Sequence, residues 1–302
     1  MKLSERLTDC GFWLGWNVLW ALPARLSYFV FDIAARVAWK LHSTGVKQLE
    51  LNLSRVMDLD PADPHVRQTS RAALRSYMRY YCETFLLPRW STADIESQVR
   101  AVNCEPLQSA LQHGGLVLSL PHSGNWDLAG AWAANEFGSL CTVAERLRPE
   151  GVFQKFLKMR RDRGIDLMPL TGEGGTYQFL RDSVNQGKVV ALLGDRDVAR
   201  NGMSNQFFGH RASLPIGAAL LAIDTERPLF TCSPFYDGDK LVLIFDEEVT
   251  FDRTPVTGRD RLRKAQEVTK AVLANFERHI AANPQNWHQM QPVWPDLVSG
   301  KK

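Results

Sequence analysis

The residues best suited to chemistry lie in one segment, Pro121-His122-Ser123-Gly124-Asn125-Trp126-Asp127. The segment follows a short apolar run and precedes a helical pattern, and α/β proteins build their sites where a strand ends and a helix begins. His122 is suited to general base catalysis near neutral pH. Asp127 could fold back and orient the imidazole through its other nitrogen. Gly124 permits the tight turn between them.

The same segment has two plainer interpretations. His122 could simply end the strand while Asp127 caps the helix, because carboxylates are common in a first helical turn. Ser123 could be a nucleophile, but the G-x-S-x-G elbow of serine hydrolases is absent. We therefore rank a serine hydrolase well below a mechanism in which His122 is the base.

A second charged group, Gly194-Asp195-Arg196-Asp197, directly follows the strongest strand pattern. Because it lies at another strand end, it could face His122 across the edge of the sheet. Asp195 could bind an acceptor hydroxyl and aim it at the base, and Arg196 could pair with a carboxylate or a phosphate. A solvated turn is the alternative. The sequence leaves open whether Asp127 or Asp195 is the partner of His122.

Two further groups of residues give weaker indications of a functional site. Seven basic and three acidic residues lie from Glu145 to Arg163, a local charge of +4 (7 − 3). A phosphorylated carrier such as coenzyme A, or a phosphoinositide headgroup, would suit this charge, and a solvated helix face explains it equally well. Near the end of the chain, His288 stands beside two tryptophans, which is typical of a packed core histidine, so we predict no catalytic role for it.

The elements that must position these residues alternate between strand and helix. Buried strands are predicted at 115–120, 140–144, 166–169, 188–194, 228–235 and 240–245, and helices at 126–137, 153–163, 176–185, 215–224 and 262–282. This alternation predicts an α/β fold with a mixed, largely parallel central sheet flanked by helices.

The N-terminal part is predicted to be helical and to lie on a membrane. Residues 3–42 form two pieces that break near Pro23, with three tryptophans in the first piece. Such a helix suits the lipid headgroup region, and a hairpin packed on its own core is an equal alternative. A helix over 65–87 carries four arginines on one stripe, which could dock on anionic headgroups or be solvated. We predict a helical, membrane-surface region at 1–90 and an α/β domain at 91–302.

Composition excludes several classes of protein. The net charge of +3 on 302 residues is too small for a nucleic-acid-binding face. Five cysteines without a C-x-x-C pair argue against disulfides or structural zinc and for buried thiols. No Gly-rich phosphate loop, metal-binding motif or secretory signal is evident. The uncharged run over 10–24 is shorter than the roughly 20 residues that span a bilayer.

Four motifs in a fixed order resemble a known family. They are Pro-His-Ser-Gly-Asn-Trp-Asp at 121–127, Ala-Glu-Arg-Leu-Arg-Pro-Glu at 144–150, Asp-Arg-Asp at 195–197 with Phe-Phe-Gly at 207–209, and Asn-Trp-His at 286–288. Together they resemble the bacterial lipid A biosynthesis acyltransferases over roughly residues 1–297. Within that family the chain is most similar to the actinobacterial enzymes that acylate phosphatidylinositol mannosides.

The resemblance implies roles for individual residues. His122 matches the catalytic histidine of the family, and Asp195 falls where the mannoside enzymes carry a catalytic glutamate. Glu145, Arg160 and Arg196 match positions that line the substrate pocket. We also expect Asn125, inside the His122 segment, to bind substrate. In the implied mechanism His122 removes the proton of a sugar hydroxyl as it attacks a thioester, without a covalent acyl-enzyme and without a metal or other cofactor.

The resemblance also implies substrates and a location. The donor would be acyl-CoA, such as palmitoyl-CoA, and the acceptor the 6-hydroxyl of the mannose on the inositol 2-position of mono- or dimannosylated phosphatidylinositol. The enzyme would be peripheral, on the cytoplasmic face of the cell membrane. Alternatives are a lipid A-type acyltransferase that uses acyl carrier protein, an acyl thioesterase or lipase, and a non-catalytic membrane scaffold.

Overall fold

The computed structural model describes residues 22–146, 150–169, 175–198 and 200–300. Seven strands form one sheet in the order β1-β9-β8-β2-β5-β3-β4. Every neighbouring pair is parallel except β8 and β9. The strands are β1 (Val99–Val102), β2 (Leu116–Leu120), β3 (Leu140–Ala144), β4 (Ile165–Pro169), β5 (Val189–Leu193), β8 (Leu229–Asp237) and β9 (Lys240–Phe245). The prediction of a mixed, largely parallel sheet is confirmed.

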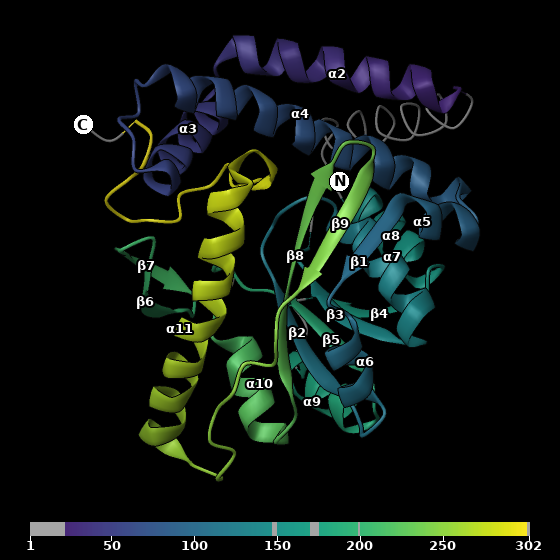
Figure 1. Cartoon of the computed structure of the whole chain (residues 1–302), viewed down its shortest axis with the longest axis vertical. Helices are drawn as coiled ribbons and strands as arrows, with labels where there is room; N and C mark the ends of the chain where they lie inside the picture. Colours follow the sequence, from purple (N-terminus) through teal and green to yellow (C-terminus); the bar gives the residue numbers. More distant parts are fainter. Residues whose placement is uncertain (1–21, 147–149, 170–174, 199, 301–302) are drawn as a thin grey trace.

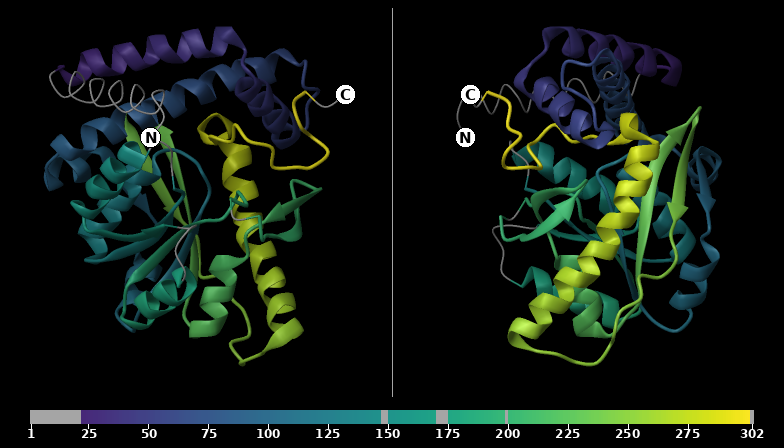
Figure 2. Two further views of the ribbon diagram at one scale, coloured as in Figure 1. Left: turned by 180° about the vertical axis from the view of Figure 1, so that it is seen from behind. Right: turned by 60° about the vertical axis from the view of Figure 1, so that its left-hand side comes forward.

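Helices cover both faces of the sheet because its central strands are apolar on both sides. All five residues of β2 are buried. Leu118 and Leu120 face the core that contains α7 (Trp126–Phe137) and α8 (Glu150–Arg161). Val117 faces the opposite core, with α9 (Thr176–Asn185), α10 (Gly217–Thr225) and α11 (Gly258–Ala282). Figure 2 shows these helices on the two sides of the sheet.

A separate layer of helices lies across the end of the sheet where β2 and β5 finish. It consists of α2 (Ala24–Leu41), α3 (Thr44–Met57) and α4 (Pro64–Leu86). Figures 1 and 2 show α2 and α4 side by side, with α4 between α2 and the sheet. Asp63 caps the start of α4 by accepting a hydrogen bond from the His65 amide, and Pro64 occupies the first helical position.

Most predicted elements are present, and the missed ones are short or polar. The missed elements are α3, α5 (Thr92–Gln98), β1, α6 (Glu105–Leu111), the hairpin of β6 (Met203–Phe207) and β7 (His210–Leu214), and the turns η1 (Leu87–Arg89) and η2 (Pro284–Asn286). The four residues of β1 form an edge strand with no fully buried side chain, so the run is too short to show a pattern. The helical piece predicted before Pro23 lies outside the described residues.

Two arginines of the α4 stripe pair with carboxylates of the neighbouring helices α2 and α3. Arg67 pairs with Glu50 of α3 and lies over the ring of Trp39, 4.0 Å from its centroid. Arg75 Nε donates to Asp32 of α2 at 2.5 Å. These guanidinium groups are engaged by carboxylates of the chain, and the docking of the stripe on lipid headgroups remains a prediction.

The outer face of α2 is apolar. Its exposed side chains follow helical spacing, and the exposed fractions are 60% for Phe29, 44% for Ile33, 51% for Val37 and 74% for Leu41. Within the described part of the chain, no helix combines the length and the apolar character needed to cross a bilayer.

The C-terminal segment returns to the helical layer. Asn52 of α3 donates to the carbonyl oxygens of Gln289 and Gln291 at 2.7 and 2.8 Å. Gln48 Oε1 accepts from the Ser299 amide at 2.8 Å. The predicted boundary near residue 90 remains a prediction, and these bonds tie α3 to the last part of the chain. Four of the five cysteines are described and are buried, unpaired thiols, as predicted.

Candidate active site

The register of β2 and β5 brings His122 and Asp195 together. The two strands are parallel, and Leu120 lies opposite Leu193. His122 and Asp195 each follow two residues later, so both leave the sheet at the same edge and level. The Gly194 amide donates to the Leu120 carbonyl at 2.9 Å, which extends the pairing by one step.

Asp195 is a buried carboxylate surrounded by donors. His122 Nδ1 lies 2.6 Å from Oδ1, while the His122 amide and Trp287 Nε1 donate to Oδ2 at 2.9 and 2.8 Å. Burial by itself would raise the pKa of the Asp195 carboxyl, but the charge and hydrogen bonds of His122 and the bond from Trp287 outweigh it, and the pKa lies below its usual value. Asp195 is therefore ionised at neutral pH.

The ionised Asp195 sets the tautomer of His122. A carboxylate can only accept, so His122 Nδ1 carries the hydrogen and Nε2 keeps a free lone pair. No group within the described ranges hydrogen-bonds Nε2, and the imidazole lines a cavity, with its side chain 16% exposed. This is the arrangement of a general base held by a carboxylate.

Of the two aspartates that the sequence left open, Asp195 is the partner of His122. Asp127 is not hydrogen-bonded to His122. It lies in the first turn of α7, 3% exposed, and accepts from Arg160 Nε at 2.6 Å and from Tyr80 Oη at 2.8 Å. Its position in the helix turns the carboxylate toward α8 and α4. Asp127 and Arg160 both line the cavity as a buried ion pair.

Asn125 does not contact the cavity, contrary to the expected role in substrate binding. It is fully buried, and its Oδ1 accepts from the Leu128 amide at 2.9 Å as the cap of α7. Its Nδ2 donates to Glu83 Oε2 at 2.8 Å. Both ends of the amide are therefore used inside the protein.

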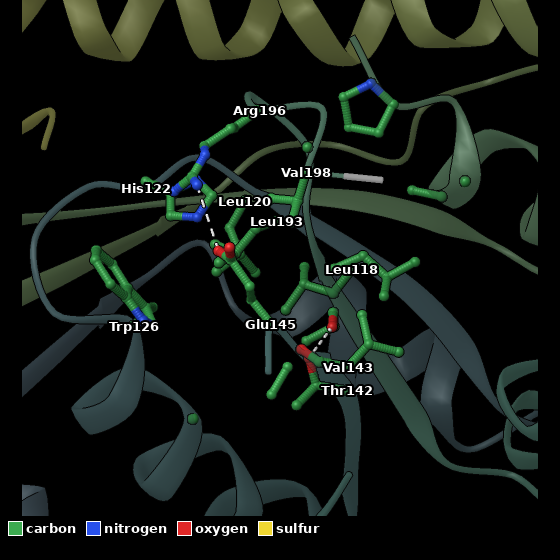
Figure 3. A pocket seen from close by; sticks show the side chains of 18 of the residues that line it. Leu118, Leu120, His122, Trp126, Thr142, Val143, Glu145, Leu193, Arg196 and Val198 are labelled. Carbon is green, nitrogen blue, oxygen red and sulfur yellow. Dashed lines mark hydrogen bonds and ion pairs between the residues drawn. The ribbon is translucent and has the colours of Figure 1, made fainter. Parts of the chain in front are cut away.

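Glu145 and Arg196 lie at the open end of the cavity, as expected of pocket residues. Arg196 Nη2 donates to Glu145 Oε2 at 3.3 Å, and the two side chains are 31% and 46% exposed. Figure 3 shows them reaching toward each other. An exposed pair of this length is weak and free to rearrange around a ligand. On α8, Arg160 pairs with Asp127, which lies outside the 145–163 segment, so part of the predicted net positive charge is neutralised.

Sequence reasoning missed the contacts between the His122 loop and the C-terminal segment that contains Trp287 and His288. Ser123 pairs with Trp287 in an isolated bridge, and the His288 amide donates to the His122 carbonyl at 2.8 Å. Gly124 has φ of +56°, and a Cβ there would lie 2.9 Å from the carbonyl carbon of Pro234. The loop therefore fits only without a side chain at Gly124. The Asn-Trp-His motif was the sequence feature that could have indicated this support, because Trp287 and His288 bond directly to the His122 loop.

His288 is 6% exposed and forms part of the cavity wall. The Tyr236 amide donates to Asn286 Oδ1, so that oxygen is an acceptor. Ser76 Oγ lies 3.2 Å from it and 2.9 Å from His288 Nε2. Both contacts are hydrogen bonds only if the Ser76 hydroxyl donates to Asn286 and His288 Nε2–H donates to Ser76. Nδ1 is then an unpaired lone pair, and it has no partner among the described groups.

The cavity has a volume of about 980 Å³ and a buried apolar end. Its wall beside α7 and the sheet consists of side chains at most 8% exposed: Leu118, Ala129, Ala133, Leu140, Ile165, Cys232, Leu243 and Phe245. The other wall reaches α9 and α10 through Leu180 and Leu220. Figure 3 shows Leu118, Leu120 and Leu193 on the sheet near His122. The site therefore joins a base to an enclosed apolar space, which suits a long acyl chain.

Comparisons with known proteins agree with this chemistry. The sequence profile of the family described as bacterial lipid A biosynthesis acyltransferase matches residues 2–295. The chain is 36% identical over 296 residues to the phosphatidylinositol mannoside acyltransferase of Mycolicibacterium smegmatis, covering 97% of this chain and 93% of the relative. It is 35% identical to the protein of that name from Mycobacterium tuberculosis, covering 100% and 93%.

One solved structure shows a weaker likeness. The 1-acyl-sn-glycerophosphate acyltransferase PlsC of Thermotoga maritima aligns with 84% of this chain and 98% of its own, at 12% identity and a TM-score of 0.38.

The buried His288 predicts an acid-sensitive fold. Burial, and then the charge of His122, lower the pKa of His288 from 6.5 to about 3. The unfolded chain therefore binds a proton between those values and the folded chain does not, so stability is lost as pH falls below 6.5. By pH 4 the loss from this group is about 3 kcal/mol. Urea denaturation at pH 7, 5.5 and 4 should show a smaller acid loss in His288→Gln.

The exposed His113 supplies the control His113→Gln, whose stability should follow that of the wild type at each pH. Equal acid losses in His288→Gln and the wild type would show that the folded protein tolerates a charged His288.

Proposed function

Because the chain belongs to the bacterial lipid A biosynthesis acyltransferase family, we propose that it transfers a long acyl chain from acyl-CoA to a phosphatidylinositol mannoside. The acceptor group is the 6-hydroxyl of the mannose on the inositol 2-position. The observation that carries the proposal is the His122–Asp195 pair at the wall of a cavity with a buried apolar end. The names of the two mycobacterial relatives support the class of acceptor.

The proposed reaction is a direct transfer. His122 Nε2 takes the proton of the mannose hydroxyl while its oxygen attacks the thioester carbonyl carbon. Asp195 stabilises the imidazolium through Nδ1–H. The tetrahedral intermediate collapses, the carbon–sulfur bond breaks, and the imidazolium returns the proton to the departing thiolate. Arg196, at the open end of the cavity, is a cationic side chain available to the developing oxyanion.

The donor chain is proposed to enter the apolar end of the cavity beside α7. Ala129 and Ala133 face that space from α7, and their small side chains leave it open. The phosphates of the carrier would then lie outside, near the exposed Arg161 of α8. Parallel assays with palmitoyl-CoA and palmitoyl acyl carrier protein test the choice of carrier.

The enzyme is proposed to be peripheral, on the cytoplasmic face of the cell membrane. The exposed apolar stripe of α2 is flanked by exposed cationic side chains at Arg25 and Lys40. An apolar face with basic flanks suits insertion among anionic headgroups. The acceptor lipid would be met at the same surface.

The proposal is tested first by removing the base. Purified wild type and His122→Ala receive palmitoyl-CoA and phosphatidylinositol monomannoside in mixed micelles, with mass spectrometry of the glycolipid and an assay of thiol release. We expect acylated lipid from the wild type and a loss of about 10³-fold or more in the variant. Thiol release without acylated lipid would indicate a thioesterase, and transfer at a normal rate by the variant would contradict the role of His122.

Replacing the carboxylate tests the tautomer. In Asp195→Asn the amide can donate to Nδ1, so the imidazole is no longer held with its lone pair on Nε2. The comparable change in a catalytic triad lowers kcat by about 10⁴-fold, and we expect a loss of about 10³- to 10⁴-fold here. The control is Asp166→Asn, which removes an exposed carboxylate paired with Lys188. A loss of less than about tenfold in Asp195→Asn would argue against the pairing.

Filling the apolar end should change chain-length preference. Ala133→Leu adds three carbons to a wall residue that is 5% exposed. Rates with acyl-CoA donors of increasing length should fall for long chains and hold for short ones, because only long chains reach the added side chain. A uniform loss over all chain lengths would indicate that the acyl chain lies elsewhere.

A further inference from the structure

A second buried carboxylate, Glu83 of α4, lies behind the His122 loop and outside the cavity wall. It is 1% exposed. Its Oε1 accepts from Arg79 Nε at 2.7 Å and from Tyr28 Oη at 3.3 Å. Its Oε2 accepts from Asn125 Nδ2 at 2.8 Å and from Tyr236 Oη at 2.6 Å. One carboxylate thus joins α2, α4, β8 and the loop that carries His122.

Packing alone does not explain this arrangement. A buried ion pair adds little net stability compared with apolar residues of the same size, but its geometry is strict. Burial and the charge of Glu83 raise the pKa of Tyr28 and Tyr236, so both hydroxyls stay protonated and can only donate to it. Every neighbour of the carboxylate is therefore a donor, which fixes where each neighbour lies.

The hydrogen bonds around Glu83 fix the orientation of the Asn125 side-chain amide. An asparagine amide can be turned over, exchanging its donor and acceptor ends. Here Nδ2 faces the Glu83 carboxylate and Oδ1 faces the Leu128 amide, so the turned orientation would lose both bonds. Asn125 is three residues after His122, and its carbonyl accepts from the Ala129 amide at 2.9 Å. The amide thus anchors the end of the loop to the first turn of α7.

The same carboxylate also supports the other side of the loop. Tyr236 lies at the end of the β8 segment against which Gly124 packs, with Pro234 and Phe235 within 3.0 Å of a Cβ built there. The Tyr236 hydroxyl bonds Glu83, and its amide bonds Asn286 Oδ1 at 3.0 Å. Gly124 in turn donates to the Asn286 carbonyl at 3.0 Å. The loop is held between Asn125 and β8, and both contacts lead to Glu83.

We propose that Glu83 is a positioning residue for the reaction, holding the His122 loop through the amide of Asn125. Glu83 touches neither the cavity nor His122, so it acts through the loop alone. Misplacing a reacting group by about 1 Å can cost about 100-fold in rate. The inference rests on the proposed acyl transfer, in which His122 must meet the acceptor hydroxyl at hydrogen-bond distance.

Exchanging the two groups tests the contact. Glu83→Gln alone sets the glutamine NH2 against a donor in either orientation, Asn125 Nδ2 in one and Arg79 Nε in the other. Asn125→Asp alone sets two carboxylates against each other. In the double variant Glu83→Gln/Asn125→Asp the new glutamine amide donates to the new aspartate, which still accepts from the Leu128 amide. The hydrogen bond between positions 83 and 125 is therefore restored with donor and acceptor exchanged, and the Tyr236 hydroxyl, which donates to the same Glu83 oxygen in the wild type, then accepts from the glutamine amide.

We expect each single variant to lower kcat by about 10- to 100-fold with KM within about threefold of the wild type. The double variant should recover kcat to within about fivefold of the wild type. A double variant no more active than the product of the two single losses would overturn the proposal, as would single variants with normal kcat. If Glu83→Gln does not fold, Tyr236→Phe, which removes one donor, is expected to lower kcat by a smaller factor.

Glu50→Gln is the matched control. Glu50 is also a buried carboxylate, 9% exposed, that pairs with an arginine of α4, and it has no contact with the loop. We expect it to lower the melting temperature at least as much as Glu83→Gln and to leave kcat unchanged. A parallel loss of kcat in Glu50→Gln would show that Glu83 contributes only to stability.

A second readout separates this inference from the proposed substrates. The proton NMR signal of His122 Nδ1–H, which is bonded to Asp195, reports the position of the imidazole relative to that carboxylate. It can be recorded without any substrate. It should shift in both single variants and return in the double variant. If the wild type acylates no phosphatidylinositol mannoside but this signal behaves as expected, the proposed acceptor fails and the positioning role stands. An unchanged signal in the single variants would contradict the positioning role.

Discussion

The parallel pairing of β2 with β5 is the constraint on which the site depends. Leu120 and Leu193 are partners in this register, so the residues two positions later meet at the same edge of the sheet. A shift of one residue would turn every side chain of the strand to the opposite face. That shift would move Leu118 and Leu120 into the core that Val117 now faces, and it would separate His122 from Asp195. The burial that stabilises the strand pair therefore also fixes the 2.6 Å contact between imidazole and carboxylate.

The helical layer supplies the part of the cavity wall that faces the sheet. Three tyrosines of α4, Tyr77, Tyr80 and Tyr81, line the cavity together with His122. Tyr80 also donates to Asp127, and its ring lies 4.1 Å from that of Trp126. The site is thus enclosed between an α/β sheet and a helix that the chain makes before the sheet begins. The arginines of α4 have the related task of holding α2 and α3 in place.

Buried polar groups around the His122 loop are arranged for a single geometry. Asp195 accepts four hydrogen bonds, the longest from Gln289 Nε2 at 3.5 Å, and Glu83 also accepts four. Each set includes donors from segments far apart in the chain. A buried carboxylate is costly unless its lone pairs are satisfied. Any other position of the loop would leave some of these groups unpaired. This explains how a loop with a glycine at its centre can hold a catalytic base in place.

The sequence by itself determined the central strands, most of the long helices and the residues at their ends. Apolar runs of five or six residues showed the central strands, and His122 and Asp195 were recognisable because each follows such a run. The four ordered motifs indicated the family. Local pattern carries this information because burial and helical or strand periodicity act over neighbouring residues.

Only the tertiary structure decided which groups meet. Asp127 was a reasonable partner for His122 at a separation of five residues, yet the structure pairs Asp127 with Arg160, 33 residues away, and His122 with Asp195, 73 residues away. Asn125 resembled a substrate ligand and is instead bound to Glu83, 42 residues earlier. The arginine stripe of α4 resembled a free surface for lipid, yet two of its arginines pair with Glu50 of α3 and Asp32 of α2. These contacts depend on strand register and on the packing of distant helices, which no local pattern in the chain specifies.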